Sequence, residues 1–339
     1  MRVDWIKKTK EGIQVKDGSF YVDPIYPVKT AIITHGHADH ARAGHEHVIA
    51  TLETLEIMKE RYGNNFCKKS TVLKYHEKLT IEEVKIFLAP AGHVLGSAQV
   101  VMNFANQVIT VSGDYKRQDD PTCAAFEPIK SDIFITEATF ALPVFKHPNA
   151  NTQINLLIKS IQNFPERCHV IGVYSLGKAQ RLIKMLRNSG WHNTIYLHGS
   201  LVKICNLYEK FGIDLGDLEP ATIQDKPEKP HDFYKGKLIL APPSALADRW
   251  SRRFPDPILG MASGWMTVKQ RAKQRGINLP LILSDHADWN EILTTIKEVS
   301  PKEVWITHGA EEALIYECSK NNLTAKALSI IGYESDTDL

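Results

Sequence analysis

The sequence predicts an α/β protein in which one layered domain is interrupted by a second α/β unit. The 339 residues are too many for one ordinary core and suit two. Hydrophobic residues make up 43% of the chain and charged residues 24%, the balance of a globular protein. Short strands fill the first third, strands alternate with helices from about residue 145, and the first pattern returns near residue 279.

The first part is expected to be rich in strands. Residues 12–23 alternate around the turn Lys16-Asp17-Gly18, which is typical of a hairpin. Residues 52–62 have helical spacing and end at Gly63. Further strands are predicted at residues 30–33, 84–88, 99–104, 107–112 and 132–137.

The middle part has the alternation that indicates a parallel sheet covered on both faces. Helices are predicted at residues 150–164, 176–187 and 200–211, and strands at 169–174, 194–197 and 237–241. The polar, proline-rich residues 219–232 are expected to form a loop. The first domain then resumes with a strand at 279–284, a helix at 289–299 and a strand at 303–307.

Composition excludes several classes of protein. No stretch approaches the ~20 apolar residues of a membrane helix, and the first twelve residues lack the apolar run of a signal peptide. We therefore expect a cytoplasmic protein without a membrane association. Its five scattered cysteines include no CxxC pair and are interpreted as reduced thiols.

Charge is balanced overall but uneven locally. The chain has 41 Lys+Arg and 39 Asp+Glu, which gives a net charge of +2. Residues 249–284 hold seven basic side chains and one acidic one, whereas residues 214–232 are acidic. A solvated face and a phosphate-binding face are both compatible with the basic stretch.

A dense group of metal-capable side chains follows the strand predicted at residues 30–33. It is the segment Thr34-His35-Gly36-His37-Ala38-Asp39-His40. A loop there can turn His35 and His37 toward one metal, and Asp39 and His40 toward another. Imidazole and carboxylate together suit zinc, manganese or iron. The alternative, a histidine-rich solvated loop, seldom has this density.

Three further candidates each come directly after a predicted strand. His93 lies in Gly92-His93, Asp114 in Gly113-Asp114, and His308 in Thr307-His308-Gly309. Each residue alone is more often a packed or solvated side chain than a ligand. Their shared position at strand ends is what favours a common metal site.

The ordered set HxHxDH, GH, GD and HG resembles the metallo-β-lactamase superfamily of metal-dependent hydrolases, whose fold is an αββα sandwich. The resemblance implies two divalent metal ions, zinc or manganese. It implies that His35, His37 and His93 hold the first metal. It further implies that Asp39, His40 and His308 hold the second metal, that Asp114 bridges the two, and that Asp23 braces the histidine loop.

Two more motifs look like those of the β-CASP nucleases within that superfamily. They are Thr136-Glu137-Ala138-Thr139 and Ser284-Asp285-His286-Ala287-Asp288. β-CASP proteins insert an α/β cap with a parallel sheet into the hydrolase domain. The resemblance therefore implies a metallo-β-lactamase part at residues 1–144, a cap at 145–281 and a return segment at 282–339.

The expected chemistry is hydrolysis of a phosphodiester. Two metals can share a hydroxide that attacks phosphorus, in a catalytic centre that includes Asp39. The leaving oxygen still needs a proton, and His286 is the candidate acid, held and kept charged by Glu137. The alternatives are a surface acid at Glu137 and an ordinary helix-start residue at His286.

Substrate phosphates are expected to bind in the cap. Gly177 and Lys178 open a predicted helix, whose first N–H groups favour anions. Lys178, Arg181 and Lys184 would share one face, which ordinary solvent exposure explains equally well. The other candidates for substrate binding are Ser244, Arg249, Lys269 and Arg271.

Segments such as residues 174–180, 196–199 and 284–289 are similar to bacterial ligase-associated DNA exonucleases. This resemblance implies a DNA exonuclease of repair or end processing, with DNA preferred over RNA and a functional association with a DNA ligase and helicase. An RNA nuclease of the RNase J or messenger-RNA 3′-end-processing type shares every catalytic residue and stays open. The short segment after His308 favours the DNA branch.

The cap and His286 argue against a small-ester or thioester hydrolase, and the complete ligand set argues against a non-enzymatic scaffold.

Overall fold

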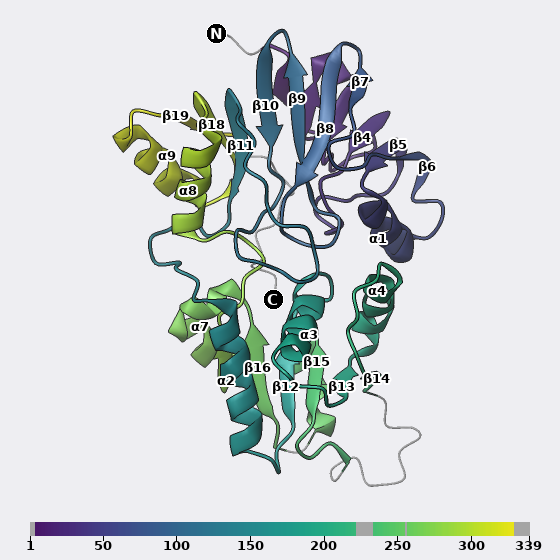
Figure 1. Cartoon of the computed structure of the whole chain (residues 1–339), viewed down its shortest axis with the longest axis vertical. Helices are drawn as coiled ribbons and strands as arrows, with labels where there is room; N and C mark the ends of the chain where they lie inside the picture. Colours follow the sequence, from purple (N-terminus) through teal and green to yellow (C-terminus); the bar gives the residue numbers. More distant parts are fainter. Residues whose placement is uncertain (1–3, 222–232, 255, 329–339) are drawn as a thin grey trace. The chain divides into compact units, whose positions relative to one another are not determined.

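The computed structural model describes residues 4–221, 233–254 and 256–328, which form two compact units. The first unit contains residues 4–145 and 286–328, and the second contains the described part of residues 146–285 (Figure 1). Of the predicted loop at 219–232, residues 219 and 220 belong instead to a strand, and residues 222–232 lie outside the described residues. The assignment of these segments as hydrolase domain and cap stays a prediction.

The first sheet of the first unit has six strands in chain order. Its first three strands pair antiparallel and the later ones pair parallel. They are β1 (Ile6–Lys8), β2 (Ile13–Val15), β3 (Phe20–Val22), β4 (Thr30–Ile32), β5 (His45–Ala50) and β6 (Cys67–Val72). Because β3, β4 and β5 are parallel, the residues that follow them leave the sheet at the same edge.

The second sheet has seven strands and mixes both kinds of pairing. The strands from β19 to β10 are parallel, and those from β10 to β7 are antiparallel. In spatial order they are β19 (Thr324–Ala327), β18 (Glu303–Gly309), β11 (Ile133–Ala138), β10 (Gln107–Val111), β9 (Ala98–Phe104), β8 (Val84–Pro90) and β7 (Leu79–Ile81).

The two sheets pack face to face and helices cover their outer sides. Side chains such as Phe20 and Ile32 from one sheet and Val100 and Ile133 from the other form a single buried core. Helix α1 (Leu52–Tyr62) packs on the outside of the first sheet. Helices α8 (Trp289–Val299) and α9 (Glu311–Lys320) cover the second sheet. The unit is therefore an αββα sandwich, and the predicted fold class is confirmed.

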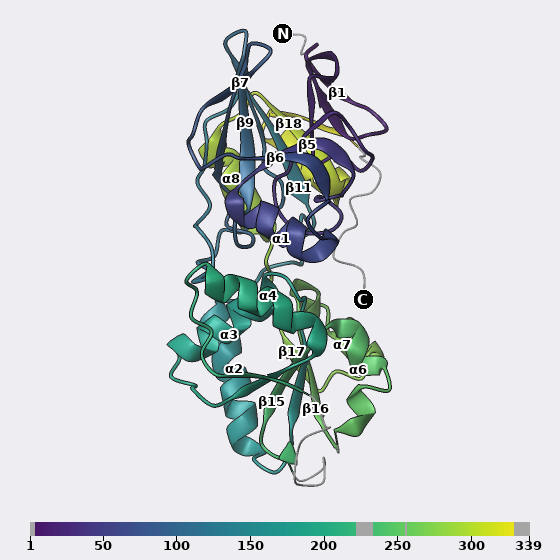
Figure 2. The same cartoon turned by 90° about the vertical axis from the view of Figure 1, so that its right-hand side faces the viewer.

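The second unit is built on one parallel sheet of six strands, as the alternating pattern predicts. Their spatial order is β14 (Leu218–Pro220), β13 (Ile195–Leu197), β15 (Leu238–Ala241), β12 (His169–Gly172), β16 (Ile258–Ala262) and β17 (Leu279–Leu281). Helices α2 (Ala150–Asn163) and α3 (Lys178–Asn188) lie on one side of the sheet (Figure 2). Helices α6 (Pro243–Ala247) and α7 (Lys269–Gln274) lie on the other, and α4 (Gly199–Lys210) follows β13.

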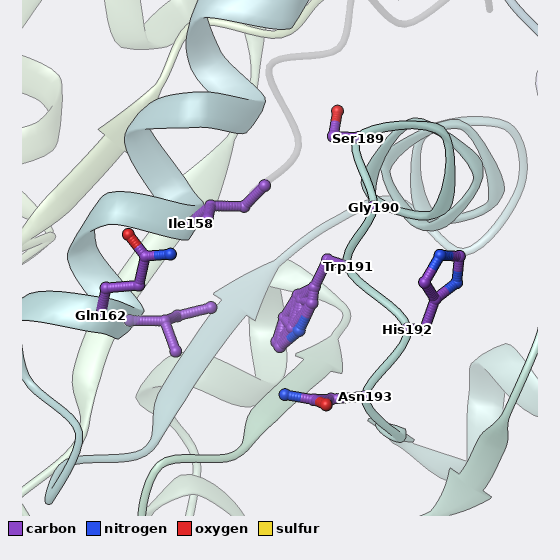
Figure 3. A pocket seen from close by; sticks show the side chains of 8 residues that line it. Ile158, Gln162, Ser189, Gly190, Trp191, His192 and Asn193 are labelled. Carbon is purple, nitrogen blue, oxygen red and sulfur yellow. The ribbon is translucent and has the colours of Figure 1, made fainter.

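A pocket of about 290 Å³ lies in this unit between α2 and the loop after α3. Ile158, Gln162, Trp191 and Asn193 are among the residues that line it (Figure 3). The pocket lies beside the start of β13, whereas ligands of parallel sheets bind beyond the carboxyl ends of the strands. We assign it no part in catalysis.

The predicted hairpin, the predicted helices and the predicted strands are all present, with ends that shift by at most three residues. The sequence patterns missed β5 and β16, among others. Strand β5 begins His45-Glu46-His47, which does not read as an apolar strand although His45 is buried. No helix in the described ranges has the length and apolar character to span a bilayer.

A buried histidine gives the second unit a predictable response to acid. His169 begins β12, is fully buried, and its Nε2 lies 2.9 Å from the Ser160 hydroxyl of α2. Burial lowers the pKa of His169 from 6.5 to about 4. Because the unfolded chain takes up this proton first, the native state loses stability as the pH falls from 6.5 to 4.

We therefore predict that the wild-type protein exceeds the His169→Gln variant in free energy of unfolding by the largest amount above pH 6.5. This difference should become smaller as the pH falls to 4. The check is the difference between the two urea midpoints, measured at several pH values. A difference that stays constant from pH 7 to pH 4 contradicts the prediction.

Candidate metal centre

Asp23 fixes the start of the histidine loop from a neighbouring strand end. It follows β3, and the parallel strand β4 runs into the loop at the same edge. Asp23 Oδ1 accepts the Thr34 backbone N–H at 2.7 Å, and Oδ2 accepts the Thr34 hydroxyl at 2.6 Å. Oδ2 also lies 2.8 Å from Nδ1 of His40. A carboxylate on one ring nitrogen orients the other, so Asp23 turns Nε2 of His40 toward Asp114.

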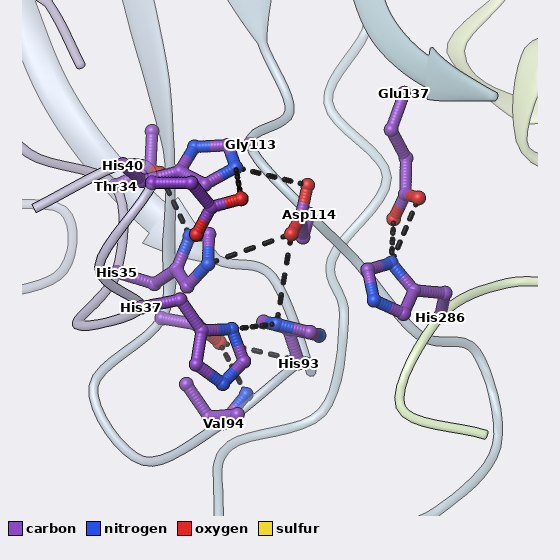
Figure 4. A network of polar contacts seen from close by, with 12 residues as sticks. Thr34, His35, His37, His40, His93, Val94, Gly113, Asp114, Glu137 and His286 are labelled. Atoms are coloured by element: carbon purple, nitrogen blue, oxygen red, sulfur yellow. Dashed lines mark hydrogen bonds and ion pairs between the residues drawn. The ribbon is translucent and has the colours of Figure 1, made fainter. Parts of the chain in front are cut away.

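Four predicted ligands form a first cluster, defined as His35, His37, His93 and Asp114. One ligand atom from each lies within 4.8 Å of all the others. Nε2 of His93 is 2.9 Å from Nδ1 of His37, and Asp114 Oδ2 is 3.5 Å from Nε2 of His35 (Figure 4). All but His37 are buried. Three imidazoles and one carboxylate therefore converge on one point inside the protein.

Glycine lets the Asp114 loop reach the histidine loop. Gly113 has φ of 57°, a conformation that other residues rarely adopt. A Cβ atom at this position would lie 2.8 Å from the side chain of Thr34. Close approach of these two loops brings Asp114 to the histidines, and only glycine permits it.

A second cluster, defined as Asp39, His40, His308 and Asp114, lies on the other side of Asp114. Nε2 of His40 is 3.5 Å from Asp114 Oδ1 and 3.6 Å from Asp39 Oδ2. Nε2 of His308 is 3.6 Å from the same Oδ1. The two oxygens of Asp114 thus face different clusters, as a bridging carboxylate requires.

Glu137 and His286 form a buried pair beside these clusters. Nδ1 of His286 lies 2.8 Å from Glu137 Oε2, and its ring centroid lies 4.7 Å from that of His93. Glu137 also accepts the Tyr115 backbone N–H at 2.8 Å and the Thr139 hydroxyl at 2.5 Å. Burial raises the pKa of Glu137, but the charge and hydrogen bond of His286 outweigh it and the net pKa is lowered. Glu137 is therefore a carboxylate at neutral pH.

Glu137 also lies close to two proposed metal ligands, which the sequence analysis did not predict. Its carboxylate, Asp114 and His308 have ligand atoms within 4.8 Å of one another. The motif around Glu137 predicts only that it holds His286. Its approach to Asp114 arises from the parallel pairing of β10 with β11, where Asp114 and Glu137 lie near the same strand ends.

Burial and the neighbouring charges shift the pKa values of the groups at this site. Burial raises the pKa of Asp114 to about 7, with partial compensation from His40. Burial lowers the pKa of His40, but the carboxylates of Asp114 and Asp39 outweigh it and raise the pKa to about 10. Burial lowers the pKa of His308 to about 4. His40 therefore offsets only part of the cost of burying an ionised Asp114.

The residues present fit a pair of divalent cations. Nε2 of His35 and Oδ1 of Asp114 are buried and make no hydrogen bond to any described residue. Such buried polar atoms are costly unless a partner satisfies them. Imidazole nitrogen and carboxylate oxygen are donors that zinc and manganese accept. The first cluster could hold one cation, and the second could hold another.

The predicted substrate residues all lie in the second unit. Gly177 caps α3, but its N–H donates to the Gln180 side chain at 2.8 Å. Lys178 is 1% exposed, and its Nζ lies 3.7 Å from Asp285 Oδ2. Because Arg181 is also fully buried, the solvent-face interpretation is wrong for both cations.

The remaining substrate candidates lie nearer the surface of that unit. Ser244, Arg249 and Lys269 are exposed, on or next to α6 and at the start of α7. Arg271 is half-buried, with its guanidinium 4.1 Å from the centre of the Trp265 ring. None of them belongs to the two clusters, which lie in the first unit, so their role in substrate binding stays a prediction.

Comparisons with known proteins agree with this geometry. Residues 280–319 match the family described as the Zn-dependent metallo-hydrolase RNA specificity domain. A protein named probable DNA ligase from Opitutus terrae is 25% identical over 337 residues, which are 96% of this chain and 31% of that protein. Cleavage and polyadenylation specificity factor 73 from Drosophila melanogaster is 33% identical over 147 residues, which are 41% of this chain and 21% of that protein.

A solved structure supports the fold. The crystal structure of a protein of unknown function from Enterococcus faecalis V583 aligns with a TM-score of 0.60 at 14% identity. The alignment covers 87% of this chain and 78% of that one. The chain spans less than a third of the length of each of the two named relatives above.

The αββα sandwich, its histidine clusters and the matched domain are together typical of a metallo-hydrolase. Within that class, the matched domain and the named relatives support the similarity of the chain to the β-CASP nucleases of the metallo-β-lactamase superfamily.

We predict that His308→Ala weakens binding of one cation much more than of the other. His308 contributes to the second cluster only, so the first cluster keeps all its donors. Elemental analysis after dialysis should give about one cation per chain in place of two. The matched control is His47→Ala, whose half-buried ring contacts Thr71 away from both clusters. Equal loss of both cations contradicts this division of ligands.

Proposed function

We propose that the protein is a two-metal phosphodiesterase that acts as a DNA exonuclease in DNA repair or end processing. The observation that carries the chemistry is the buried Glu137–His286 pair next to seven convergent metal-capable side chains. A hydrolase that only has to activate a water molecule does not need a further imidazole that is held apart from the metal ligands. A nuclease benefits from one, because an alkoxide leaves its phosphodiester poorly without a proton.

The proposed metal-binding set is His35, His37 and His93 for one cation, Asp39, His40 and His308 for the other, and Asp114 for both. Divalent cations bound there, zinc or manganese, would bring the pKa of water to about 7 and neutralise charge on the phosphodiester. Asp23 orients His40 directly, and Thr34, which Asp23 holds, has its hydroxyl 3.0 Å from Nδ1 of His35.

His286 is proposed to give its proton to the leaving oxygen. Glu137 holds Nδ1, so Nε2 is the ring atom that carries the transferable proton. The ionised Glu137 stabilises the charged imidazolium before transfer. Tyr115 and Thr139 keep the Glu137 carboxylate in place through the two hydrogen bonds that it accepts.

The preference for DNA is supported by the relative named as a probable DNA ligase, because that similarity extends over 96% of the chain. The same similarity supports a functional association with DNA-ligase chemistry. The second candidate is an RNA endonuclease. It is favoured by the match of residues 280–319 to an RNA specificity domain and by the Drosophila relative.

A direct assay separates the two candidates. We predict that the protein with Zn²⁺ or Mn²⁺ shortens end-labelled DNA progressively from one end and cleaves matched RNA at least tenfold more slowly. Asp114→Ala, which removes the carboxylate shared by both clusters, serves as the inactive control. Internal cuts in RNA at a higher rate than any loss from DNA ends would favour the RNA endonuclease.

We predict that His286→Ala retains both cations and most of its substrate affinity but cleaves about 10²–10⁴-fold more slowly, since only proton donation is lost. A substrate with sulfur in place of the leaving oxygen departs without a proton. It should rescue His286→Ala substantially and Asp114→Ala hardly at all. Single-turnover cleavage and metal analysis provide both readouts. Loss of metal from His286→Ala, or the absence of rescue, would show that His286 is not the acid.

A further inference from the structure

A buried lysine contacts the backbone of a proposed metal ligand. Lys116 comes two residues after Asp114 and is 1% exposed. Its Nζ donates to the backbone carbonyl of His93 at 3.1 Å. Lysine is almost never this buried unless its charge is paired, so the position calls for an explanation beyond packing.

Asp120 supplies the paired charge. Its Oδ2 accepts from Lys116 Nζ at 2.5 Å, and both side chains are almost wholly buried. Its Oδ1 accepts the backbone N–H of Thr122 at 2.8 Å and the hydroxyl of the same residue at 2.6 Å. Asp120 is therefore held in place, and it fixes the ammonium of Lys116 against the His93 carbonyl.

The same segment contacts the His93 loop in other ways. The Lys116 backbone N–H donates to the Ala91 carbonyl at 3.2 Å. A Cβ atom on Gly92 would lie 2.5 Å from the Lys116 carbonyl oxygen, and Gly92 has φ of 75°. On the other side of the loop, the His93 backbone N–H donates to the Ser97 hydroxyl at 3.0 Å. Both polar groups of the His93 backbone thus have a side-chain partner.

We propose that Lys116 is a positioning residue for the first cluster: its ammonium, neutralised by Asp120, clamps the His93 carbonyl and so holds the His93 imidazole toward His37 and Asp114. This inference rests on the proposed metal-binding role of His93. A ligand on a flexible loop would lose backbone freedom on each binding event, whereas a ligand whose backbone is already fixed has lost that freedom beforehand.

The test uses the double variant Lys116→Met/Asp120→Asn. Removing both partners together leaves no uncompensated buried charge, so the protein should stay folded. Thermal unfolding and circular dichroism check this. Titration of the metal-free protein with Co²⁺, followed by its d–d absorption, then reports both affinity and ligand geometry at each site.

We expect the double variant to bind one of the two Co²⁺ ions about 10–100-fold more weakly and with an altered spectrum, while the other ion is bound normally. The matched control is Lys302→Met, which removes a lysine that pairs with Asp132 at 2.7 Å but is 81% exposed. It should change neither affinity nor spectrum.

A folded double variant with unchanged Co²⁺ affinity and spectrum overturns the proposal. An equal weakening of both ions also overturns it, because that is the result of a general loosening of the fold. Neither outcome depends on cleavage. If the native protein binds two Co²⁺ ions but hydrolyses no phosphodiester, the proposed function fails while the role of Lys116 is still decided by the titration.

Discussion

The buried carboxylate of Asp114 is the constraint on which the rest of the site depends. It is 4% exposed, it faces imidazoles on both oxygens, and burial raises its pKa to about 7. An isolated carboxylate at such a position would simply take up a proton. Burial also lowers the pKa of His35 and His308, so these two imidazoles are neutral donors, whereas the pKa of His40 is raised to about 10. Added positive charge would favour the ionised form of Asp114 further.

The sandwich explains how so many polar groups reach one point. Parallel strands direct their carboxyl ends to one edge, and both sheets contain such strands. The first sheet supplies the loop after β4, and the second supplies the ends of β10, β11 and β18. The apolar core lies between the sheets, away from that edge. Polar side chains can therefore gather at the edge without interrupting the packing that stabilises the unit.

Local sequence patterns predict some features of the fold and of the site but not others. Strands that alternate with helices, and the dense HxHxDH segment, are local patterns, so the parallel sheet and the position of the histidine loop could be predicted from them. Strand β5 could not, because histidines stand where an apolar strand would have apolar residues. The burial of Lys178 and Arg181 also could not be predicted, because their spacing on α3 suits a solvated face equally well. The contact of Lys116 with the His93 carbonyl joins residues 23 positions apart. Because it involves a backbone atom of His93, neither residue spacing nor composition predicts it.

Residues 114–116 connect the two halves of the proposed chemistry. Asp114 lies between the metal clusters. The Tyr115 N–H donates to Glu137, and its carbonyl accepts the N–H of Ala287, next to His286. Lys116 holds the His93 loop. A shift of this segment would therefore move the metal ligands and the acid together. Groups joined in one hydrogen-bonded network respond non-additively when they are changed. The metal centre and the Glu137–His286 pair are thus better understood as one unit, fixed by a single strand end, than as two independent sites.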